Sequence, residues 1–308
     1  MSPQTVFVCG ITGTQGGAVA HRIFTKPGWV AHGLVRNPDA ETARKLTARG
    51  AKLFPTPDGY DDDDTLAKAM AGCTAVFIAM MPDFADPDHE IRQVRSILKH
   101  AREAGAKRVV LSTSFLADRP WEAEGWHPDK LFAKFFLAKN KLEGMVKEAS
   151  GFESWTILRP GFFMANFLPP NAIMYPDIAT TRVWKTALLP DTRVDMIDEL
   201  DIGAFAVAAI DDPGKFNKQE IEIAGQPLTP AEIARQISQA LGKEFKAEFY
   251  TVEEIEAQKE NPFIQGNIAA RTMSKCFNED KANSYGIRFG TFEEFLQRRK
   301  EDFVKFYA

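Results

Sequence analysis

The chain has few cysteines, and their spacing excludes two classes of protein. Only three occur among 308 residues, at Cys9, Cys73 and Cys276. They show no paired or clustered spacing of the kind that a disulfide framework or a structural zinc site requires. The first two adjoin predicted strands, so we expect reduced and mostly buried thiols. The five histidines are equally scattered, and we therefore expect no metal site.

Long hydrophobic runs are also missing. The longest, such as residues 75–81, are far shorter than the roughly 20 residues that a membrane-spanning helix needs. Residues 1–4 lead directly into a strand, so we expect no leader sequence. The net charge of -4 is spread along the chain, which argues against nucleic-acid binding through a basic face. We expect a cytoplasmic or nucleocytoplasmic protein that does not contact membranes.

The strongest pattern lies in the first forty residues. A short apolar run at 5–9 ends directly in the glycine-rich segment 10–17. Helical spacing follows at 18–24, and a second apolar run covers 29–35. This order of strand, glycine turn, helix and strand is the context in which a glycine motif indicates dinucleotide binding.

Each glycine of this turn has a separate physical role. Gly10 allows the tight turn, Gly13 lets the backbone approach a pyrophosphate, and Gly16 lets the helix pack closely on its strand. The unpaired N–H groups of the helix N-terminus then face the phosphates. The residues of the turn that we expect at the cofactor are Gly10, Thr12, Gly13, Thr14, Gln15 and Gly16.

Arg36, which closes the second strand, bears on the choice of dinucleotide. An acidic residue at this place would accept a hydrogen bond from a ribose 2′-hydroxyl, whereas an arginine suits a 2′-phosphate. The alternative is an ordinary surface arginine at a strand end. We interpret Arg36 as indicating NADP(H).

Helices and strands alternate through residue 160. We expect helices at 39–48, 88–104 and 129–148, and strands at 51–54, 75–80, 108–111 and 155–160. This alternation predicts an α/β fold with a doubly wound parallel sheet of the Rossmann type. We expect this domain to cover 1–160, and a smaller α/β domain for substrate or partner to cover 161–308, with strands such as 219–224 returning to the main sheet.

Ligands of such sheets lie beyond the carboxyl ends of the strands. The candidate cofactor contacts at or just after these ends are Gly10, Arg36, Asp58, Met80, Met81 and Ser112. Met80 is equally compatible with an ordinary position in the core.

Four consecutive aspartates at 61–64 allow two interpretations. They resemble a cation site in composition, but they immediately precede a predicted helix. Acidic residues at a helix start cap it and interact favourably with its dipole. Since divalent-ion loops need ligands at set alternations and a glycine turn, capping is the favoured interpretation.

Two motifs resemble the NmrA-like family of atypical short-chain dehydrogenase/reductases. One is the Gly-x-x-Gly-x-x-Gly spacing with Thr12 inside it, and the other is the segment 156–167, which contains Ile-Leu-Arg-Pro-Gly-Phe-Phe-Met-Ala-Asn-Phe. The resemblance is close over about the first half of the chain. It implies that Asp58 lies where family members contact the adenine, and it adds Pro160 and Phe163 to the expected cofactor contacts.

Beyond residue 160 a proline-broken region is rich in aromatic side chains, including Phe163, Phe167, Tyr175 and Trp184. They could form the wall of a pocket for a small apolar or aromatic ligand, or they could be core between the domains. Both interpretations remain open. Further along, Thr229, Pro230 and Glu232 have the spacing of a capping box at a helix start.

The resemblance also draws attention to a missing catalytic residue. Short-chain reductases use a tyrosine acid with a lysine four residues later, and none of the five tyrosines here has that lysine. Lys139 lies in a segment that looks like the family's lysine segment, and the tyrosine position is then Phe135. Lys139 could still bind the nicotinamide ribose, and it is the catalytic candidate if the protein is an enzyme. The alternative is a solvated lysine on a basic helix face.

Two functions therefore remain. The first, which the resemblance to the NmrA-like family implies, is a redox-sensing regulator that binds NADP(H), acts on a protein partner and performs no turnover. The second is an NADPH-dependent oxidoreductase for a quinone, an enone or an aromatic ketone. The missing tyrosine favours the first hypothesis, whereas a water, the lysine or the substrate itself could handle protons in the second.

Overall fold

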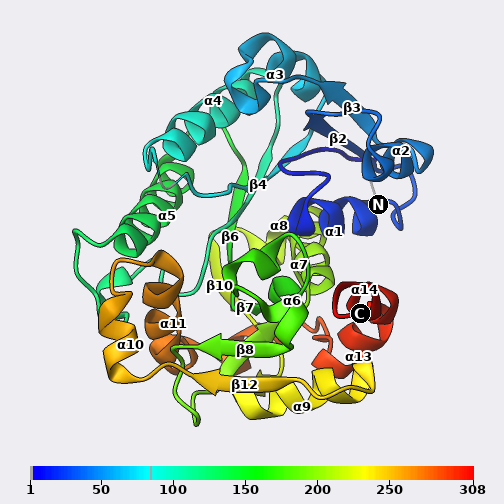
Figure 1. The fold of residues 1–308 in the computed structure, drawn as a ribbon. Coiled ribbons are helices and arrows are strands. Elements are labelled where there is room, and N and C mark those ends of the chain that lie inside the picture. The colour runs from blue at the N-terminus through cyan, green and yellow to red at the C-terminus, as the bar shows by residue number, and fades with distance from the viewer. Residues whose placement is uncertain (1–2, 84) are drawn as a thin grey trace. The chain divides into compact units, whose positions relative to one another are not determined.

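A seven-stranded sheet organises the N-terminal part of the chain in the computed structural model, which describes residues 3–83 and 85–308. The strand order is β10-β6-β5-β4-β1-β2-β3 (Figure 1). The strands are β1 Thr5–Val8, β2 Val30–Val35, β3 Lys52–Pro55, β4 Ala75–Ala79, β5 Arg108–Ser112, β6 Ser154–Pro160 and β10 Gln219–Ile223. The pairs from β3 through β6 are parallel. The doubly wound parallel sheet predicted from the sequence is thus confirmed.

Strand β10 extends this sheet beyond β6. At one end the Lys218 N–H donates to the Trp155 carbonyl oxygen at 2.8 Å, and at the other the Gly161 N–H donates to the Ile223 carbonyl oxygen at 3.0 Å. The residue numbers increase in the same direction along both strands from one hydrogen bond to the other, so β10 runs parallel to β6. One edge of the sheet is therefore formed by β10, which begins at Gln219, whereas its neighbour β6 ends at Pro160.

Helices cover both faces of the sheet. Helices α1 Thr14–Ile23, α2 Glu41–Ala48, α3 Asp63–Met70, α4 His89–Glu103 and α5 Leu131–Glu148 follow its strands, with a short 3-10 turn η1 at Gly59–Asp61. Helices α7 Glu199–Asp211 and α8 Pro213–Phe216 precede β10. Helices α3, α4 and α5 contribute to one core cluster, while α1 packs against α7 on the other side (Figure 1). The predicted helices at 39–48 and 88–104 begin slightly later, because Asp39 and Asp88 precede the helical turns.

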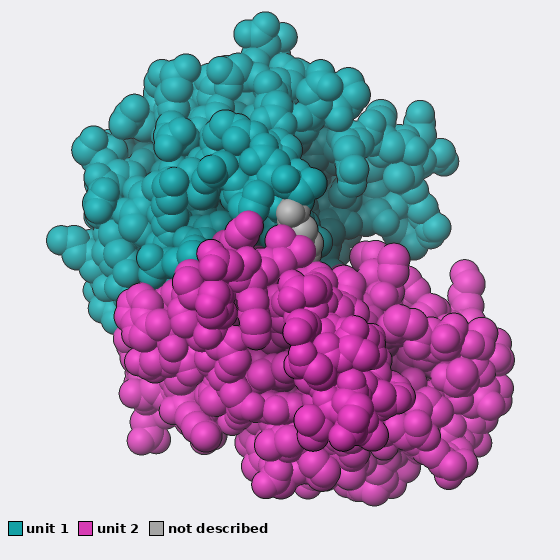
Figure 2. All heavy atoms as spheres, turned by 60° about the vertical axis from the view of Figure 1, so that its left-hand side comes forward, with its two compact units in different colours: residues 1–117, 137–159, 199–221 teal, residues 118–136, 160–198, 222–308 magenta. Residues whose placement is uncertain are grey.

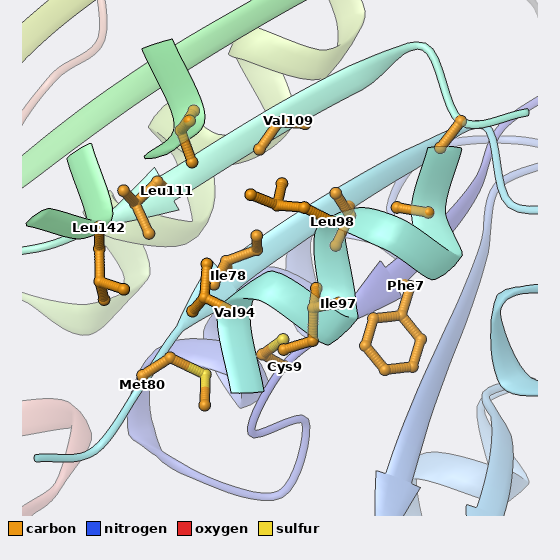
Figure 3. Close-up of a cluster of buried hydrophobic side chains, with 14 of the residues drawn as sticks. Phe7, Cys9, Ile78, Met80, Val94, Ile97, Leu98, Val109, Leu111 and Leu142 are labelled. Carbon is orange, nitrogen blue, oxygen red and sulfur yellow. The ribbon is translucent and has the colours of Figure 1, made fainter. Parts of the chain in front are cut away.

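The core beneath α3, α4 and α5 is built from strand side chains that point towards those helices. Phe7, Ile78 and Leu111 come from three neighbouring strands, and Val94 and Leu142 come from α4 and α5 (Figure 3). All five are at most 1% exposed. This apolar layer holds the strands against the helices, so the loops at the carboxyl ends of the strands start from fixed positions.

The chain divides into two compact units (Figure 2). Unit 1 contains residues 1–117, 137–159 and 199–221, and unit 2 contains residues 118–136, 160–198 and 222–308. Cys9 and Cys73 in unit 1 are buried free thiols, and Cys276 in unit 2 is a partly exposed one. The expected reduced cysteines are therefore confirmed.

Unit 2 combines two small sheets with several helices. Its sheets are β11-β9-β7 and β12-β8, formed by β7 Phe162–Phe163, β8 Val183–Thr186, β9 Val194–Ile197, β11 Pro227–Leu228 and β12 Lys246–Phe249. Its α-helices are α6 Ile178–Thr181, α9 Pro230–Leu241, α10 Val252–Ala257, α11 Pro262–Met273, α12 Glu279–Asn283, α13 Phe292–Arg298 and α14 Lys300–Phe306. Its 3-10 turns are η2 Pro120–Glu122, η3 Met164–Phe167, η4 Asn171–Met174 and η5 Ser274–Cys276.

Most of the aromatic residues after residue 160 form the core of unit 2. Phe167 and Trp184 are completely buried and pack edge to face, with ring centroids 4.9 Å apart. The hydroxyl of Tyr307, near the C-terminus, donates to the Phe167 carbonyl oxygen at 2.7 Å. Phe167 and Trp184 therefore belong to the core within unit 2, which is neither a ligand wall nor a core between the domains.

Two helix starts follow the capping chemistry that their sequences predict. The Asp62 carboxylate accepts from the Thr65 N–H at 3.0 Å and caps α3. Thr229 and Glu232 form the complete reciprocal capping box of α9. The favoured role of the aspartate run as a helix cap is thus confirmed at Asp62.

A buried ionic network joins α5 to β6, β5 and β10. The Arg159 guanidinium on β6 pairs with the Glu143 carboxylate of α5 at 2.6 Å and also with Glu220 of β10. Glu143 is 1% exposed and accepts a further hydrogen bond from the Thr113 hydroxyl at 2.8 Å. Burial opposes ionisation of Glu220, but Lys147 and Arg159 outweigh it and lower the pKa of that carboxyl group.

Removing Glu143 should destabilise the protein strongly. Glu143→Ala leaves the Arg159 charge buried without its best partner, and we expect a loss of about 3 kcal/mol in the free energy of unfolding. Urea denaturation measures it. The control is Glu148→Ala, an exposed position on the same helix, which should change the value by less than about 0.5 kcal/mol. Equal losses in the two variants would contradict the importance of the network.

Close packing of α1 on β1 depends on Gly16. A Cβ atom at Gly16 would lie 2.3 Å from the Gly10 carbonyl oxygen and 2.4 Å from the Cys9 carbonyl oxygen. Neither oxygen can move aside, because both belong to the main chain. One position further, a Cβ at Gly17 would lie 3.6 Å from the Ile11 carbonyl oxygen, which is an ordinary contact.

These adjacent glycines provide a matched pair of substitutions. Gly16→Ala should lower the free energy of unfolding by about 2 kcal/mol, because the helix must move off the strand. Gly17→Ala should be neutral or stabilising by up to about 1 kcal/mol, since alanine is the better helix former. Thermal and urea denaturation of both variants test the difference. Similar stabilities would show that α1 does not need the close approach.

Candidate functional site

The carboxyl edge of the main sheet contains a point where the strand order reverses. Strand β1 lies between β2 and β4, so the chain proceeds outwards in one direction through β2 and β3 and in the other through β4 and β5. Open α/β sheets bind their ligands in the crevice at this position. Gly10 follows β1 and Met80 follows β4, so these two residues flank the reversal.

The glycine turn after β1 has the conformation that the motif requires. Gly10 adopts φ +60°, in the left-handed region that glycine tolerates best, and its carbonyl oxygen accepts from the Gly13 N–H at 2.7 Å. Gly13 is the N-cap of α1, so the N–H groups of Thr14, Gln15 and Gly16 begin the helix. Such groups have no acceptor within the helix and are suited to phosphate oxygens. Thr12 and Gly13 are solvent-exposed.

Two predicted site residues contact each other across this turn. The Ser112 hydroxyl at the end of β5 donates to the Gln15 amide oxygen at 2.6 Å. Ser114, two residues further on, has a buried hydroxyl oxygen for which the structure gives no hydrogen-bond partner within residues 3–83 and 85–308. A buried hydroxyl without a hydrogen-bond partner is unusual in a folded protein and marks Ser114 as a candidate ligand contact.

The predicted adenosine contacts lie beyond the neighbouring strands. Arg36 comes directly after β2 and is exposed, and within the described part of the chain no hydrogen bond or ion pair engages its guanidinium group. Asp58 precedes η1 after β3 and is exposed as well. Both side chains are therefore accessible to a ligand at the carboxyl edge.

The remaining predicted contacts differ in their accessibility. Met80 belongs to the core cluster (Figure 3) and is 9% exposed. Met81 is 83% exposed. Pro160 ends β6 and is buried, and Phe163 ends β7 and is partly exposed. The side chain of Met80 therefore follows the core interpretation, while its main chain continues into the site.

Lys139 is the most heavily engaged of the predicted residues. It is 3% exposed, and its ammonium group donates to the Glu90 carboxylate at 2.5 Å and to the Met80 carbonyl oxygen at 2.9 Å. Burial lowers the pKa of Lys139 and raises the pKa of Glu90, while their mutual attraction opposes both effects. The interpretation of Lys139 as a solvated surface lysine is therefore wrong, although Lys134, Lys141 and Lys147 on the same helix are exposed.

Phe135 precedes Lys139 by one helical turn. Its ring stacks on Phe132 with centroids 5.5 Å apart and packs at an angle against Phe136 at 5.5 Å. An aromatic hydrocarbon ring cannot donate a proton, so Phe135 contributes packing at the position where the resemblance would place the reductase tyrosine.

Sequence reasoning missed two residues of the site. Glu90 lies on the apolar stripe of α4 with Val94 and Ile97, and a carboxylate on such a stripe signals a buried partner. Tyr60 carries no comparable signal. Its hydroxyl oxygen accepts from the Gly10 N–H at 2.6 Å and lies beside the Cys9 thiol, whose pKa burial raises to about 12.

Unit 2 contains a separate cavity of ≈ 240 Å³. Tyr175 and Met174 line it together with Tyr250, Phe263 and Lys185, whereas Phe163 does not contribute. Across residues 3–83 and 85–308 the structure contains no cluster of three or more histidine, cysteine or carboxylate groups arranged for a metal ion. No helix in these ranges is both long and apolar enough to cross a membrane.

Two characterised reductases are similar to the chain over most of its length. It is 31% identical over 253 residues to an NAD(P)H azoreductase of Xenophilus azovorans, a match covering 81% of this chain and 78% of the relative. It is 28% identical over 243 residues to the (4-alkanoyl-5-oxo-2,5-dihydrofuran-3-yl)methyl phosphate reductase of Streptomyces griseus, covering 79% of this chain and 76% of that protein.

Similar solved structures include both regulators and enzymes. The negative transcriptional regulator NmrA in complex with NADP has a TM-score of 0.73 at 18% identity, covering 99% of this chain and 98% of that one. The NADPH-dependent quinone oxidoreductase QOR2 of Escherichia coli, complexed with NADPH, has a TM-score of 0.72 at 19% identity, covering 95% of this chain and 99% of that one. At these identities the likeness establishes the fold alone.

The sequence profile of the NmrA-like family extends across nearly the whole chain, from residue 2 to residue 296. It therefore includes the glycine turn, the lysine helix and most of unit 2. The protein belongs to the NmrA-like family.

Proposed function

We propose that the protein is an NADPH-dependent oxidoreductase that reduces a conjugated, largely apolar acceptor. The observation that carries this proposal is the buried pair of Lys139 and Glu90. It is bonded to the carbonyl oxygen of Met80, at the position where the strand order reverses. This pair supplies an exchangeable proton where the chain lacks the reductase tyrosine.

Three features of unit 1 support NADPH as the cofactor. The glycine turn presents helix N–H groups suited to a pyrophosphate, and Gly10 has the required left-handed conformation. Arg36 is exposed at the end of β2, where a 2′-phosphate is expected. The unpartnered hydroxyl of Ser114 fits a polar ligand at the same edge.

Bound NADPH would supply a hydride, that is, a proton together with two electrons. The chain has to hold the dinucleotide and provide for the proton that the reduced acceptor takes up. Burial lowers the pKa of Lys139, so its ammonium group releases a proton more readily than a solvated lysine does, and burial raises the pKa of the Glu90 carboxyl group beside it. The hydrogen bond between Ser112 and Gln15 holds the glycine turn against the end of β5.

The acceptor class follows from chemistry that does not need a tyrosine. A quinone or an azo group accepts a hydride into a conjugated system, which spreads the developing negative charge over several atoms. Proton transfer can then come from a lysine–carboxylate pair or from water. The names of two similar proteins, an azoreductase and a quinone oxidoreductase, are in line with this class.

A second candidate function is a dinucleotide-binding regulator. It is favoured by Phe135, which occupies the tyrosine position with a ring that cannot transfer protons. In a regulator, the buried pair of Lys139 and Glu90 would only position the segment after β4. The two candidates differ in whether NADPH is consumed continuously.

The cofactor assignment predicts a selective effect of Arg36→Ala. If the guanidinium pairs with a 2′-phosphate, NADPH binding should weaken by on the order of 2 kcal/mol, and NADH binding should barely change. Calorimetric titration with both dinucleotides measures this. Arg44→Ala, on the following helix, is the matched control. Equal losses for NADPH and NADH in Arg36→Ala would refute the assignment.

The proposed reaction predicts turnover that depends on Lys139. Wild type should consume NADPH steadily with a panel of quinones and azo compounds, and Lys139→Met should lower kcat by roughly 10²-fold at saturating NADPH, the usual scale of acid–base catalysis. Lys134→Met, an exposed position on the same helix, should leave kcat unchanged. If the protein is an enzyme, Phe135→Tyr should change kcat little. If it is a regulator, the same substitution should introduce slow carbonyl reduction.

Lys139→Met also leaves Glu90 buried without its partner, so a loss of folding has to be separated from a loss of chemistry. The double variant Glu90→Leu, Lys139→Met removes both charges and should fold close to wild type. If it folds, binds NADPH and still turns over at the wild-type rate, the role of the pair is wrong. If wild type binds NADPH but reduces none of the acceptors, the regulator is favoured.

A further inference from the structure

The turn η1 after β3 connects two other segments of the carboxyl edge. Tyr60 contacts the glycine turn through the hydrogen bond from the Gly10 N–H. The next residue, Asp61, faces α4 and accepts hydrogen bonds from its side chains, including the Gln93 amide at 2.9 Å. The position of η1 is therefore linked on one side to the glycine turn and on the other to α4.

His89, the first residue of α4, contacts carboxylates with both ring nitrogens. Its Nε2 lies 2.9 Å from an Asp61 carboxylate oxygen, and its Nδ1 lies 3.2 Å from an Asp83 carboxylate oxygen. A neutral imidazole has a single N–H and can donate to only one of them. The imidazolium ion has two N–H groups and satisfies both. The two carboxylates therefore favour the protonated form of His89, because charge-assisted contacts to them outweigh the neutral Gln93 amide nitrogen, which lies 3.0 Å from Nε2.

Asp83 belongs to the segment that follows β4 and begins with Met80. Its carboxylate also accepts from the Ala85 N–H at 2.9 Å and the Asp86 N–H at 3.2 Å, so Asp83 is bonded to the main chain just before α4. His89 therefore joins the segment after β4 to the turn after β3. The turn follows β3, on the side of the sheet where the adenosine half of a dinucleotide is expected, whereas the segment follows β4, on the opposite side of β1.

Charged groups from η1, the segment after β4, α4 and α5 surround His89. Asp61 of η1 and Asp83 of the segment after β4 face the ring, and their hydrogen bonds, that of Asp61 first, raise the pKa of His89. Arg92 on the same helix opposes the positive charge, but it pairs with Asp86 at 2.5 Å. Asp88 precedes His89 in the sequence, and the Lys141 ammonium group of α5 lies 3.8 Å from the Asp88 carboxylate.

We propose that His89 is a positioning residue for the dinucleotide: as an imidazolium ion it holds the turn at Asp61 and the segment at Asp83 together, and loss of one proton releases one of them. Cofactor affinity is then coupled to pH by a residue outside the glycine turn. The inference depends on the dinucleotide site proposed above, but it concerns regulation of that site rather than the reaction.

The sign of the effect follows from the direction of the shift. A histidine whose pKa is raised in the folded protein contributes its full stabilisation below the ordinary value, near 6.5. That contribution is lost as pH rises through the raised pKa. NADPH should therefore bind most tightly on the acidic side of neutrality.

The test measures NADPH binding by calorimetry between pH 5.5 and 8.5, in wild type and in His89→Gln. The 2′-phosphate of NADPH gains a proton in part of this range, so the quantity to compare is the ratio of the two dissociation constants at each pH. We expect wild type to bind about tenfold more tightly than His89→Gln at the acidic end and nearly equally at the alkaline end. His100→Gln is the matched control, because His100 lies on the same helix and contacts Asp63 instead. It should leave the pH dependence intact.

A second measurement uses the wild-type protein alone. If the imidazolium form binds NADPH more tightly, saturation with NADPH must raise the pKa of His89 further, by thermodynamic reciprocity. An NMR titration of the imidazole resonances with and without NADPH measures this. A ratio of dissociation constants that is constant with pH, or a His89 pKa unaffected by NADPH, would overturn the proposal while leaving the dinucleotide site in place. Absence of NADPH binding at every pH would overturn the site and the proposal together.

Discussion

The architecture of unit 1 depends on the close approach of helix α1 to strand β1. With no side chain at Gly16, the helix can lie directly against the carbonyl oxygens of Cys9 and Gly10. The same contact turns the helix N-terminus towards the carboxyl edge, where its N–H groups are available to an anion. On its other side α1 meets α7, where a Cβ at Gly203 would lie 2.5 Å from the Ala18 carbonyl oxygen. Two glycines thus place one helix against both of its neighbours.

Buried charges give helix α5 its place beside the sheet. Lys139 reaches Glu90 and the main chain after β4, while one turn further on Glu143 reaches Arg159 of β6. Each ion is satisfied by a specific partner, and an apolar side chain of similar volume could pack in its place. Such pairs are more informative about geometry than about stability. They fix the register of α5 relative to β4 and β6, which a purely apolar interface would leave less constrained.

The fold alone does not decide between regulator and enzyme, because similar folds serve both. The distinction depends on a few groups near the strand reversal. Phe135, at the position that the family resemblance assigns to the tyrosine, has no proton to donate, and the proposed enzyme would use the pair of Lys139 and Glu90 instead. Coupling through His89 would add a response to pH that neither the reaction nor the dinucleotide itself requires.

Sequence reasoning was most successful where the physics is local. Glycine spacing, helix periodicity and the alternation of strands and helices depend on neighbouring residues, so the sheet, its helices and the cap at Asp62 were predictable. The position of Lys139 was predictable only as a resemblance. Neither its burial nor its partner was visible, because Glu90 is 49 residues away.

By itself, then, the sequence determined the doubly wound sheet, and it pointed to a dinucleotide motif through the glycine turn and Arg36, whereas Lys139 was indicated only by resemblance. Only the tertiary structure decided that Phe167 and Trp184 are core, that Tyr60 contacts the glycine turn, and that His89 joins Asp61 to Asp83. The reason is physical. Hydrogen bonds and ion pairs between distant segments depend on where loops lie after the strands have paired, and no local pattern encodes that position.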